Sequence, residues 1–153
     1  MGSGCGKGTP TELRLVATQK DGHEKIQITA PPQALKINEW IDSCGANITV
    51  IYQSPRILSI ACRDRVQVYA SFRLDTGNHL SLRDVIHQDR FDQLLEAITR
   101  EQGKRGKKGF TPTNNFAMAA HGLLFPTPEG EVIVSSIDLR PLLKPDVALL
   151  VGR

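Results

Sequence analysis

The first thirty residues contain two runs in which apolar and polar residues alternate, separated by an Asp-Gly pair. A period of two is typical of β-strands, and Asp-Gly favours the tight turn that joins two antiparallel strands. Two consecutive prolines then end the second run, and apolar residues recur at helical spacing over the next eleven positions. The pattern predicts a hairpin over residues 12–30 and a short helix over residues 33–43.

Three further apolar runs follow, at residues 47–53, 57–62 and 66–74. The connections between them are three residues long, a length suited to tight antiparallel turns. These runs therefore predict a three-stranded meander. In the third run the polar residues alternate with apolar ones, so we expect one face of this sheet to be covered and the other to be at least partly in contact with water.

The longest predicted helix follows the meander. Ser81 stands three residues before Asp84, the spacing of a capping box, and an apolar stripe continues from there to Gly103. We expect this helix to be kinked near Asp89. The pattern assigns the rest of the chain to a strand or a helix at residues 115–125, a strand at 131–139 and a terminal strand at 147–151.

The predicted fold class is α+β, with one antiparallel sheet formed by the N-terminal hairpin and the meander and with two main helices packed against it. No alternating series of strands and helices indicates a parallel sheet. Residues 1–10 hold four of the thirteen glycines and a proline, and they are expected to form a flexible arm. Residues 11–153 are then expected to form a single domain.

Composition narrows the class of protein. A chain of 153 residues with 40% apolar and 23% charged residues can bury one core, which excludes a disordered or collagen-like chain. No apolar run reaches the roughly 18 to 20 residues of a membrane-spanning helix, and no secretion signal is expected. The cysteines Cys5, Cys44 and Cys62 are an odd number, so reduced thiols in a cytosol-like compartment are expected, with Cys44 and Cys62 as small core residues.

The N-terminal arm contains a candidate lipidation site. Met1-Gly2 followed by small residues resembles an N-myristoylation signal, in which Gly2 accepts the acyl chain after the methionine is removed, although Gly6 stands where serine or threonine is usual. Cys5 would then lie at the membrane surface and could take a second, reversible palmitoyl chain. The alternative is a flexible leader without modification.

Part of the same arm resembles a phosphate-binding loop. Residues 4–9, Gly-Cys-Gly-Lys-Gly-Thr, are similar to the core of this loop in nucleoside monophosphate kinases. That loop must follow a buried strand and open a helix, whereas only three residues precede it here and Pro10 follows it. We therefore do not expect a kinase.

A basic segment after the long helix is the second candidate binding site. It has five basic residues and one acidic residue, a net charge of +4, against +3 for the whole chain. Such a cluster suits anionic lipid or nucleic-acid phosphates, and the alternative is a solvated loop. Two aromatic side chains are candidates for stacking on bases, Tyr69 and Phe110. The basic residues are Arg100, Lys104, Arg105, Lys107 and Lys108.

No set of residues indicates a reaction. No two of the four histidines are spaced to share a metal ion on a helix, and the aspartates of the long helix are better explained by capping and solubility. We therefore expect no enzyme, no metal and no cofactor.

The arm and the basic segment together predict a peripheral membrane-associated structural or adaptor protein. A single myristoyl chain binds membranes marginally, and a basic patch or a second acyl chain makes attachment stable. In this design the protein is similar to a viral matrix protein, a lipoprotein of the virion that lies on the cytoplasmic face of an anionic membrane and forms homo-oligomers. The alternative is a nucleic-acid-binding module for RNA or a nucleoprotein, which uses the basic segment and the polar face of the third meander strand.

Overall fold

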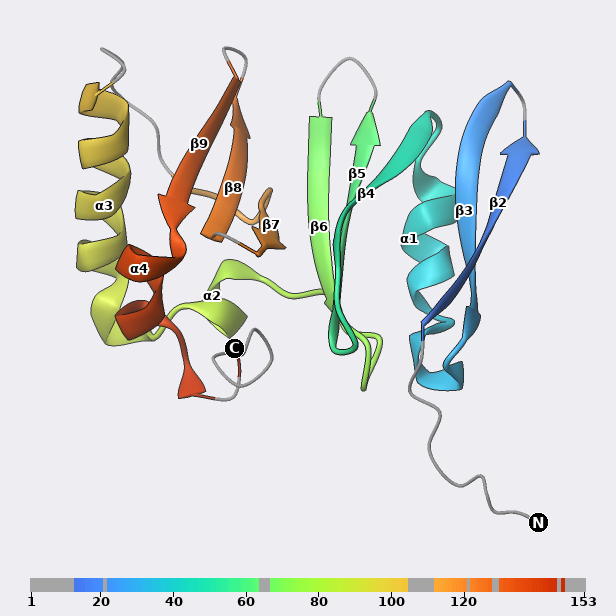
Figure 1. The fold of residues 1–153 in the computed structure, drawn as a ribbon, viewed down its shortest axis with the longest axis horizontal. Coiled ribbons are helices and arrows are strands. Elements are labelled where there is room, and N and C mark those ends of the chain that lie inside the picture. The colour runs from blue at the N-terminus through green and yellow to red at the C-terminus, as the bar shows by residue number, and fades with distance from the viewer. Residues whose placement is uncertain are drawn as a thin grey trace.

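The fold is α+β, as predicted, and consists of layers arranged side by side (Figure 1). From one end to the other lie an N-terminal hairpin, helix α1, a three-stranded meander, a second three-stranded sheet and helix α3. The computed structural model describes residues 13–20, 22–63, 67–104, 112–120, 122–127, 130–145 and 147.

The hairpin is formed by β2 (Arg14–Lys20) and β3 (His23–Ala30), which pair antiparallel as a separate two-stranded sheet. Gly22, in the turn between them, has φ +79°, a conformation that glycine adopts without cost. A short 3-10 turn, η1 (Pro32–Ala34), then leads into α1 (Ile37–Ser43). The predicted helix over residues 33–43 therefore begins as this separate turn.

The meander contains β4 (Asn47–Gln53), β5 (Ile57–Arg63) and β6 (Gln67–Arg73) in that order. One of its faces packs against α1 and the hairpin around a core that includes Ile41 and Leu58. A disulfide between Cys44 and Cys62 crosses this core and joins the end of α1 to β5. Both cysteines are buried, as expected, but the prediction that they are reduced thiols is wrong.

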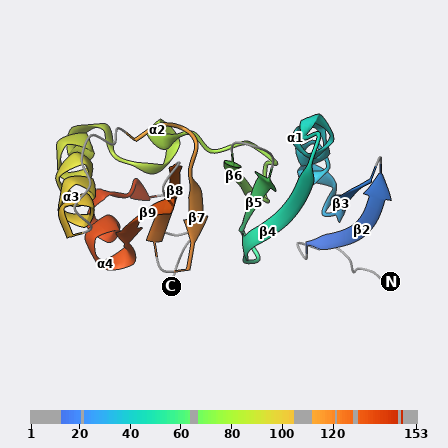
Figure 2. The same ribbon diagram turned by 90° about the horizontal axis from the view of Figure 1, so that it is seen from above.

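The other face of the meander is covered by a second sheet. This sheet contains β7 (Ala117–Ala119), β8 (Gly122–Thr127) and β9 (Gly130–Ser135), and Figure 2 shows it beside the meander. Tyr69 and Ser71 of β6 face this sheet and are buried. The middle of the predicted wet face is therefore covered, because the C-terminal third of the chain folds back over it, while Gln67 at one end of the strand is exposed.

Helices cover the far side of the second sheet. The predicted long helix is divided into α2 (Leu82–Val85), a 3-10 turn η2 (Gln88–Arg90) and α3 (Phe91–Lys104), so the expected kink is a complete break. Leu94 and Ile98 of α3 pack against Val132 and Val134 of β9 in the largest core cluster. The sheet is thus buried on both faces.

The C-terminal part of the chain differs from the prediction. Residues 115–125, which fitted a strand or a helix, form β7 and most of β8. The predicted strand over residues 131–139 ends at Ser135, where the Ser135 side chain caps α4 (Ser136–Leu139), and a 3-10 turn η3 (Arg140–Leu142) follows. Val147 is helical rather than part of a terminal strand, and residues 148–151 lie outside the described part.

Candidate functional site

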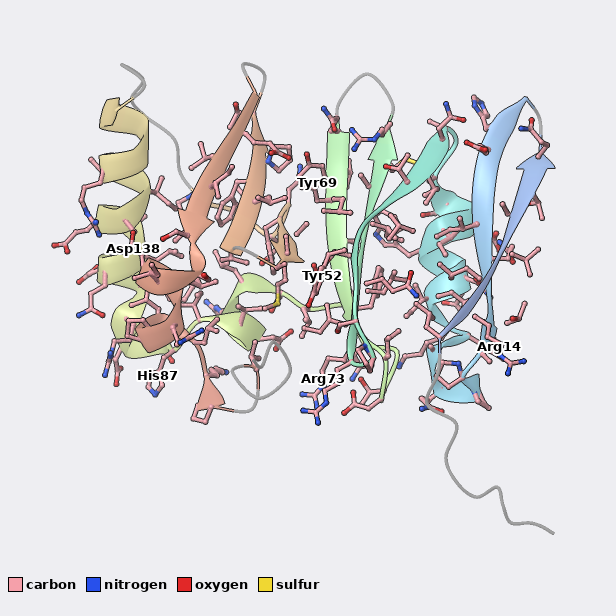
Figure 3. The ribbon with its side chains drawn as sticks, in the orientation of Figure 1. Arg14, Tyr52, Tyr69, Arg73, His87 and Asp138 are labelled. Carbon is pink, nitrogen blue, oxygen red and sulfur yellow. A yellow bond between two sulfur atoms is a disulfide. The ribbon has the colours of Figure 1, made fainter. Side chains whose placement is uncertain are left out.

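A cavity of about 330 Å³ opens between the break in the long helix and the segment after η3. Its volume lies at the lower end of the range for small-molecule sites, roughly 300 to 1,000 Å³. In Figure 3 the label of His87 marks this end of the molecule, far from Arg14 on the hairpin. The cavity is lined by Arg83, Ile86, Gln88, Phe91 and Lys144.

The site exists because α2 stops after one turn. Ser81 and Asp84 form the predicted capping box at its start, and Ile86 then adopts an extended conformation and pairs with Leu143 in an isolated β-bridge. The amide of His87 donates to the carbonyl of Leu142 at 2.8 Å, and the amide of Lys144 donates to the carbonyl of Val85 at 2.9 Å. These backbone bonds fix the two segments that carry the lining side chains.

The described lining of the cavity carries two positive charges, those of Arg83 and Lys144. Within the described residues, the side chains of Arg83 and Lys144 make no hydrogen bond or ion pair. Two acidic residues that are sequence neighbours of the lining residues have partners of their own: Asp84 accepts from Ser81, and Oδ2 of Asp89 lies 3.9 Å from the Nδ1 atom of His87. With respect to the part of the chain that the structure describes, the two cationic groups are therefore available to an anion.

The rest of the lining is apolar or neutral. Ile86 is fully buried and Phe91 is half-buried against the large core, so together they give the cavity an apolar wall. Gln88 adds an amide that both donates and accepts hydrogen bonds. A carboxylate attached to an apolar body matches this combination, since guanidinium and ammonium groups bind the carboxylate while the wall excludes water from the body.

The predicted basic site lies only partly within the described residues. Arg100 lies on α3, is exposed, and has its Nη1 atom 3.7 Å from Oδ2 of Asp138. Lys104 is the last residue of α3, so residues 100–104 of the basic segment belong to this helix rather than following it. The other predicted residues of the basic and lipidation sites lie outside the described part: Gly2, Cys5, Arg105, Lys107, Lys108 and Phe110.

Tyr69 is not available for stacking. Only 4% of its surface is exposed, and its hydroxyl donates to Oε2 of Glu131 on β9 at 2.5 Å. Burial, reinforced by this hydrogen bond, raises the pKa of Tyr69 to about 12. The predicted stacking residue instead joins the two sheets (Figure 3).

The described residues hold neither a candidate metal cluster nor a membrane-spanning helix. No three histidine, cysteine, aspartate or glutamate side chains among them gather where they could share a metal ion. None of the helices in this part of the chain is both long and apolar enough to cross a membrane.

The cavity residues were not found from the sequence. Arg83 lies inside the capping segment and Lys144 lies sixty-one positions later, so no spacing rule connects them. Their juxtaposition depends on the bridge between Ile86 and Leu143, a long-range contact with no local pattern.

Solved structures share this fold. A DUF3298 family protein from Pseudomonas aeruginosa PAO1 aligns with a TM-score of 0.56 and 12% sequence identity over 95% of this chain and 99% of that chain. A member of the same family from Bacteroides fragilis NCTC 9343 aligns with a TM-score of 0.56 and 9% identity over 92% of this chain and 95% of that chain. No family model and no curated protein matches the sequence.

These similarities correct the predicted function. The fold is that of bacterial DUF3298 family proteins, and not that of a viral matrix protein or a nucleic-acid-binding module. The prediction of an acylated, matrix-like membrane protein of the virion is therefore wrong, and so is the alternative of an RNA-binding module.

Proposed function

We propose that this protein is a non-enzymatic binding domain that takes a carboxylate-bearing ligand between Arg83 and Lys144. The observation that carries the proposal is that two cationic side chains, without partners in the described part, line a cavity with an apolar wall. Two cationic groups without ion-pair partners do not stabilise the fold, but they can bind the oxygen atoms of an anion.

The lining supports binding rather than catalysis. The described lining contains no histidine, carboxylate, cysteine or tyrosine, side chains that commonly act as general acids or bases. His87 lies close by but is not among the lining residues, and its Nδ1 atom accepts from the Asp89 amide at 3.4 Å.

The disulfide supports localisation of the protein in an oxidising compartment. Disulfides persist outside the reducing cytosol, for example in the bacterial periplasm and in secreted proteins. The predicted cytoplasmic location rested on unpaired thiols, and the Cys44–Cys62 bond removes that basis. Thiol titration of the denatured, unreduced Cys5→Ser variant should find no free thiol, and two thiols per chain would contradict the proposal.

Calorimetric titration with phenylacetate tests the proposed ligand class. This probe joins a carboxylate to an apolar ring, and phenylacetamide has the same shape without the charge. We expect phenylacetate to bind and phenylacetamide to bind at least about tenfold more weakly, since hydrogen bonds to charged groups contribute roughly 1.5 to 3 kcal/mol. Inorganic phosphate, which has no apolar body, should also bind more weakly than phenylacetate.

Substitutions localise the binding. Arg83→Gln and Lys144→Gln should each weaken phenylacetate binding, while Arg14→Gln, which removes an exposed charge at the far end of the molecule, should not (Figure 3). Equal binding of the acid and the amide, or an equal loss in the Arg14→Gln control, would contradict the proposed site.

A further inference from the structure

The outer edge of the hairpin is a second candidate binding surface, besides the cavity. Within the described residues, strand β2 pairs with β3 on one side only, because the two strands form a sheet of their own. Figure 2 shows β2 as the outermost strand at its end of the molecule. An unpaired edge presents a row of backbone donors and acceptors that another strand can use.

The hydrogen bonds of β3 show which groups of β2 are unpaired. The Ile28 amide donates to Oδ1 of Asn38 at 2.8 Å, its carbonyl accepts from Nδ2 of the same side chain at 2.9 Å, and the Glu24 amide donates to Oδ1 of Asn47 at 2.8 Å. These residues of β3 thus direct their backbone groups away from β2, toward α1 and β4.

In an antiparallel pair, residues opposite each other either exchange both hydrogen bonds or both point away. Leu15 lies opposite Ile28, Ala17 opposite Ile26 and Gln19 opposite Glu24. The backbone groups of Leu15, Ala17 and Gln19 therefore point outward along the free edge of β2.

We propose that this edge pairs with the β2 strand of a second copy of the chain, antiparallel and with Ala17 on the two-fold axis. This placement brings Ala17 opposite its own equivalent, so the outward groups of both copies meet in register. Leu15 then lies opposite Gln19 of the other copy, and the two hairpins form one continuous four-stranded sheet.

The side chains of β2 fit this self-pairing. Val16 lies opposite Thr18 of the second copy, a pair of β-branched residues of the kind that stabilises sheets. Val16 has 47% of its surface exposed in the single chain, and the second strand would cover part of it. The strand has no proline and no charged residue from Leu15 to Gln19, so the features that usually protect an edge are missing from its centre.

Two further features set the strength of the pairing. Only the five uncharged residues from Leu15 to Gln19 of each copy form the pair, so the interface is small. The dimer should therefore form reversibly as the protein concentration rises. The sequence places charges of the same sign at the two ends of β2, and these ends meet in the antiparallel pair. The dimer should therefore be stronger at high salt, which screens this repulsion.

Sedimentation velocity over a series of protein concentrations tests the proposal. We expect the unmodified chain to move from monomer to dimer, and Ala17→Glu and Ala17→Lys to be monomers because each places like charges across the axis. Ala17 is exposed, so both variants should keep the thermal midpoint of the parent chain. An equimolar mixture of the two variants should restore the dimer, because the introduced glutamate of one chain then faces the introduced lysine of the other.

Each other outcome overturns the proposal. If the chain stays monomeric at all concentrations, the β2 edge does not pair with a second copy. If Ala17→Glu still dimerises, the dimer interface lies on another surface. Failure of the mixture to associate would exclude the register centred on Ala17. Loss of phenylacetate binding has no bearing on this result, because the edge and the cavity share no residue.

Discussion

The hydroxyl of Tyr69 is the clearest example of a single polar atom that holds two layers together. It lies between the meander and the second sheet, and its acceptor, Glu131, belongs to β9. Because the pKa of Tyr69 is raised from 10 to about 12, the unfolded chain releases this proton at a lower pH than the folded chain does. Its contribution to stability is therefore complete below pH 10 and is lost as the pH rises from 10 to about 12.

Replacement of this hydroxyl gives a test with an internal control. Tyr69→Phe should lower the free energy of unfolding by about 1 kcal/mol at neutral pH, the usual contribution of one hydrogen bond. The variant should also lose less stability above pH 10 than the parent chain does. Tyr52→Phe, which changes the only other tyrosine, serves as the control in denaturant titrations. A parent chain and a Tyr69→Phe variant with the same alkaline profile would contradict the assignment.

Replacing two glycines by alanine distinguishes the energetic cost of a left-handed backbone conformation from that of a steric clash. Gly22 and Gly77 have nearly the same φ, +79° and +76°. A Cβ atom at Gly22 would meet nothing, whereas one at Gly77 would meet the carbonyl oxygen of Gln33 and the side chain of Lys36. Both replacements by alanine carry the cost of the left-handed conformation, about 1 kcal/mol.

Only Gly77→Ala has the additional steric cost, which we expect to be about 1 to 3 kcal/mol. Thermal unfolding of Gly22→Ala and Gly77→Ala should therefore show a clearly lower midpoint for the second variant. Equal midpoints would mean that the turn at residues 75–78 moves away from Gln33 and Lys36 to accommodate the methyl group.

At the scale of elements, the meander and the second sheet are joined by a closed chain of hydrogen bonds. The Met118 amide donates to Oγ of Ser71 at 2.8 Å, and Oγ of Ser59 donates to the Met118 carbonyl at 2.5 Å. The hydroxyls of the two serines lie 2.7 Å apart, so Ser71 is the donor in that bond. All three residues are buried, and every donor in the chain has an acceptor.

Ser71→Ala should lower the free energy of unfolding by about 1 to 3 kcal/mol, because it leaves the buried Met118 amide without an acceptor. Ser59→Ala should also be destabilising. The double variant should lose less than the two single losses combined, since the bond between the hydroxyls is counted in both. Ser43→Ala, at an exposed helix position, is the control in the same denaturant titrations. Additive losses would show that the serines act independently.

The contact between the two sheets also explains why the prediction of a wet face on β6 failed. Residues 57–62 form an apolar run without a charge, which is typical of a strand buried on both faces, and β5 is indeed buried along most of its length. The neighbouring β6 alternates polar and apolar residues and therefore predicted a wet face. Tyr69 and Ser71, in the middle of this face, are instead bonded to partners on the second sheet, and a one-strand pattern carries no information about those partners.

The elements defined by local contacts were predictable, since the hairpin, the meander and the capping box all rest on neighbours in sequence. The break after Val85 was not, because the backbone groups released there are bonded to Leu142 and Lys144. The same long-range bonds assemble the cavity, and this is why the candidate site could not be read from the chain.

At the scale of the whole molecule, the layers place the two proposed sites at opposite ends. The cavity lies beside the start of α3 and the free edge lies on β2, with the meander and the second sheet between them (Figure 1). A dimer through β2 would therefore hold two cavities far apart and open. The dimer would then present two carboxylate-binding cavities, and the two chains that carry them would be joined by one continuous sheet.

Binding of a carboxylate at the cavity is the central claim, and backbone amide chemical shifts test it most directly. Titration of the ¹⁵N-labelled chain with phenylacetate should move the amide signals of Ile86, His87, Gln88 and Lys144, which surround the cavity. The amides of Leu15 and Ala17 should not move, and phenylacetamide should leave all of these signals nearly unchanged. Shifts that are absent at the cavity, or that the neutral amide reproduces, would contradict the account.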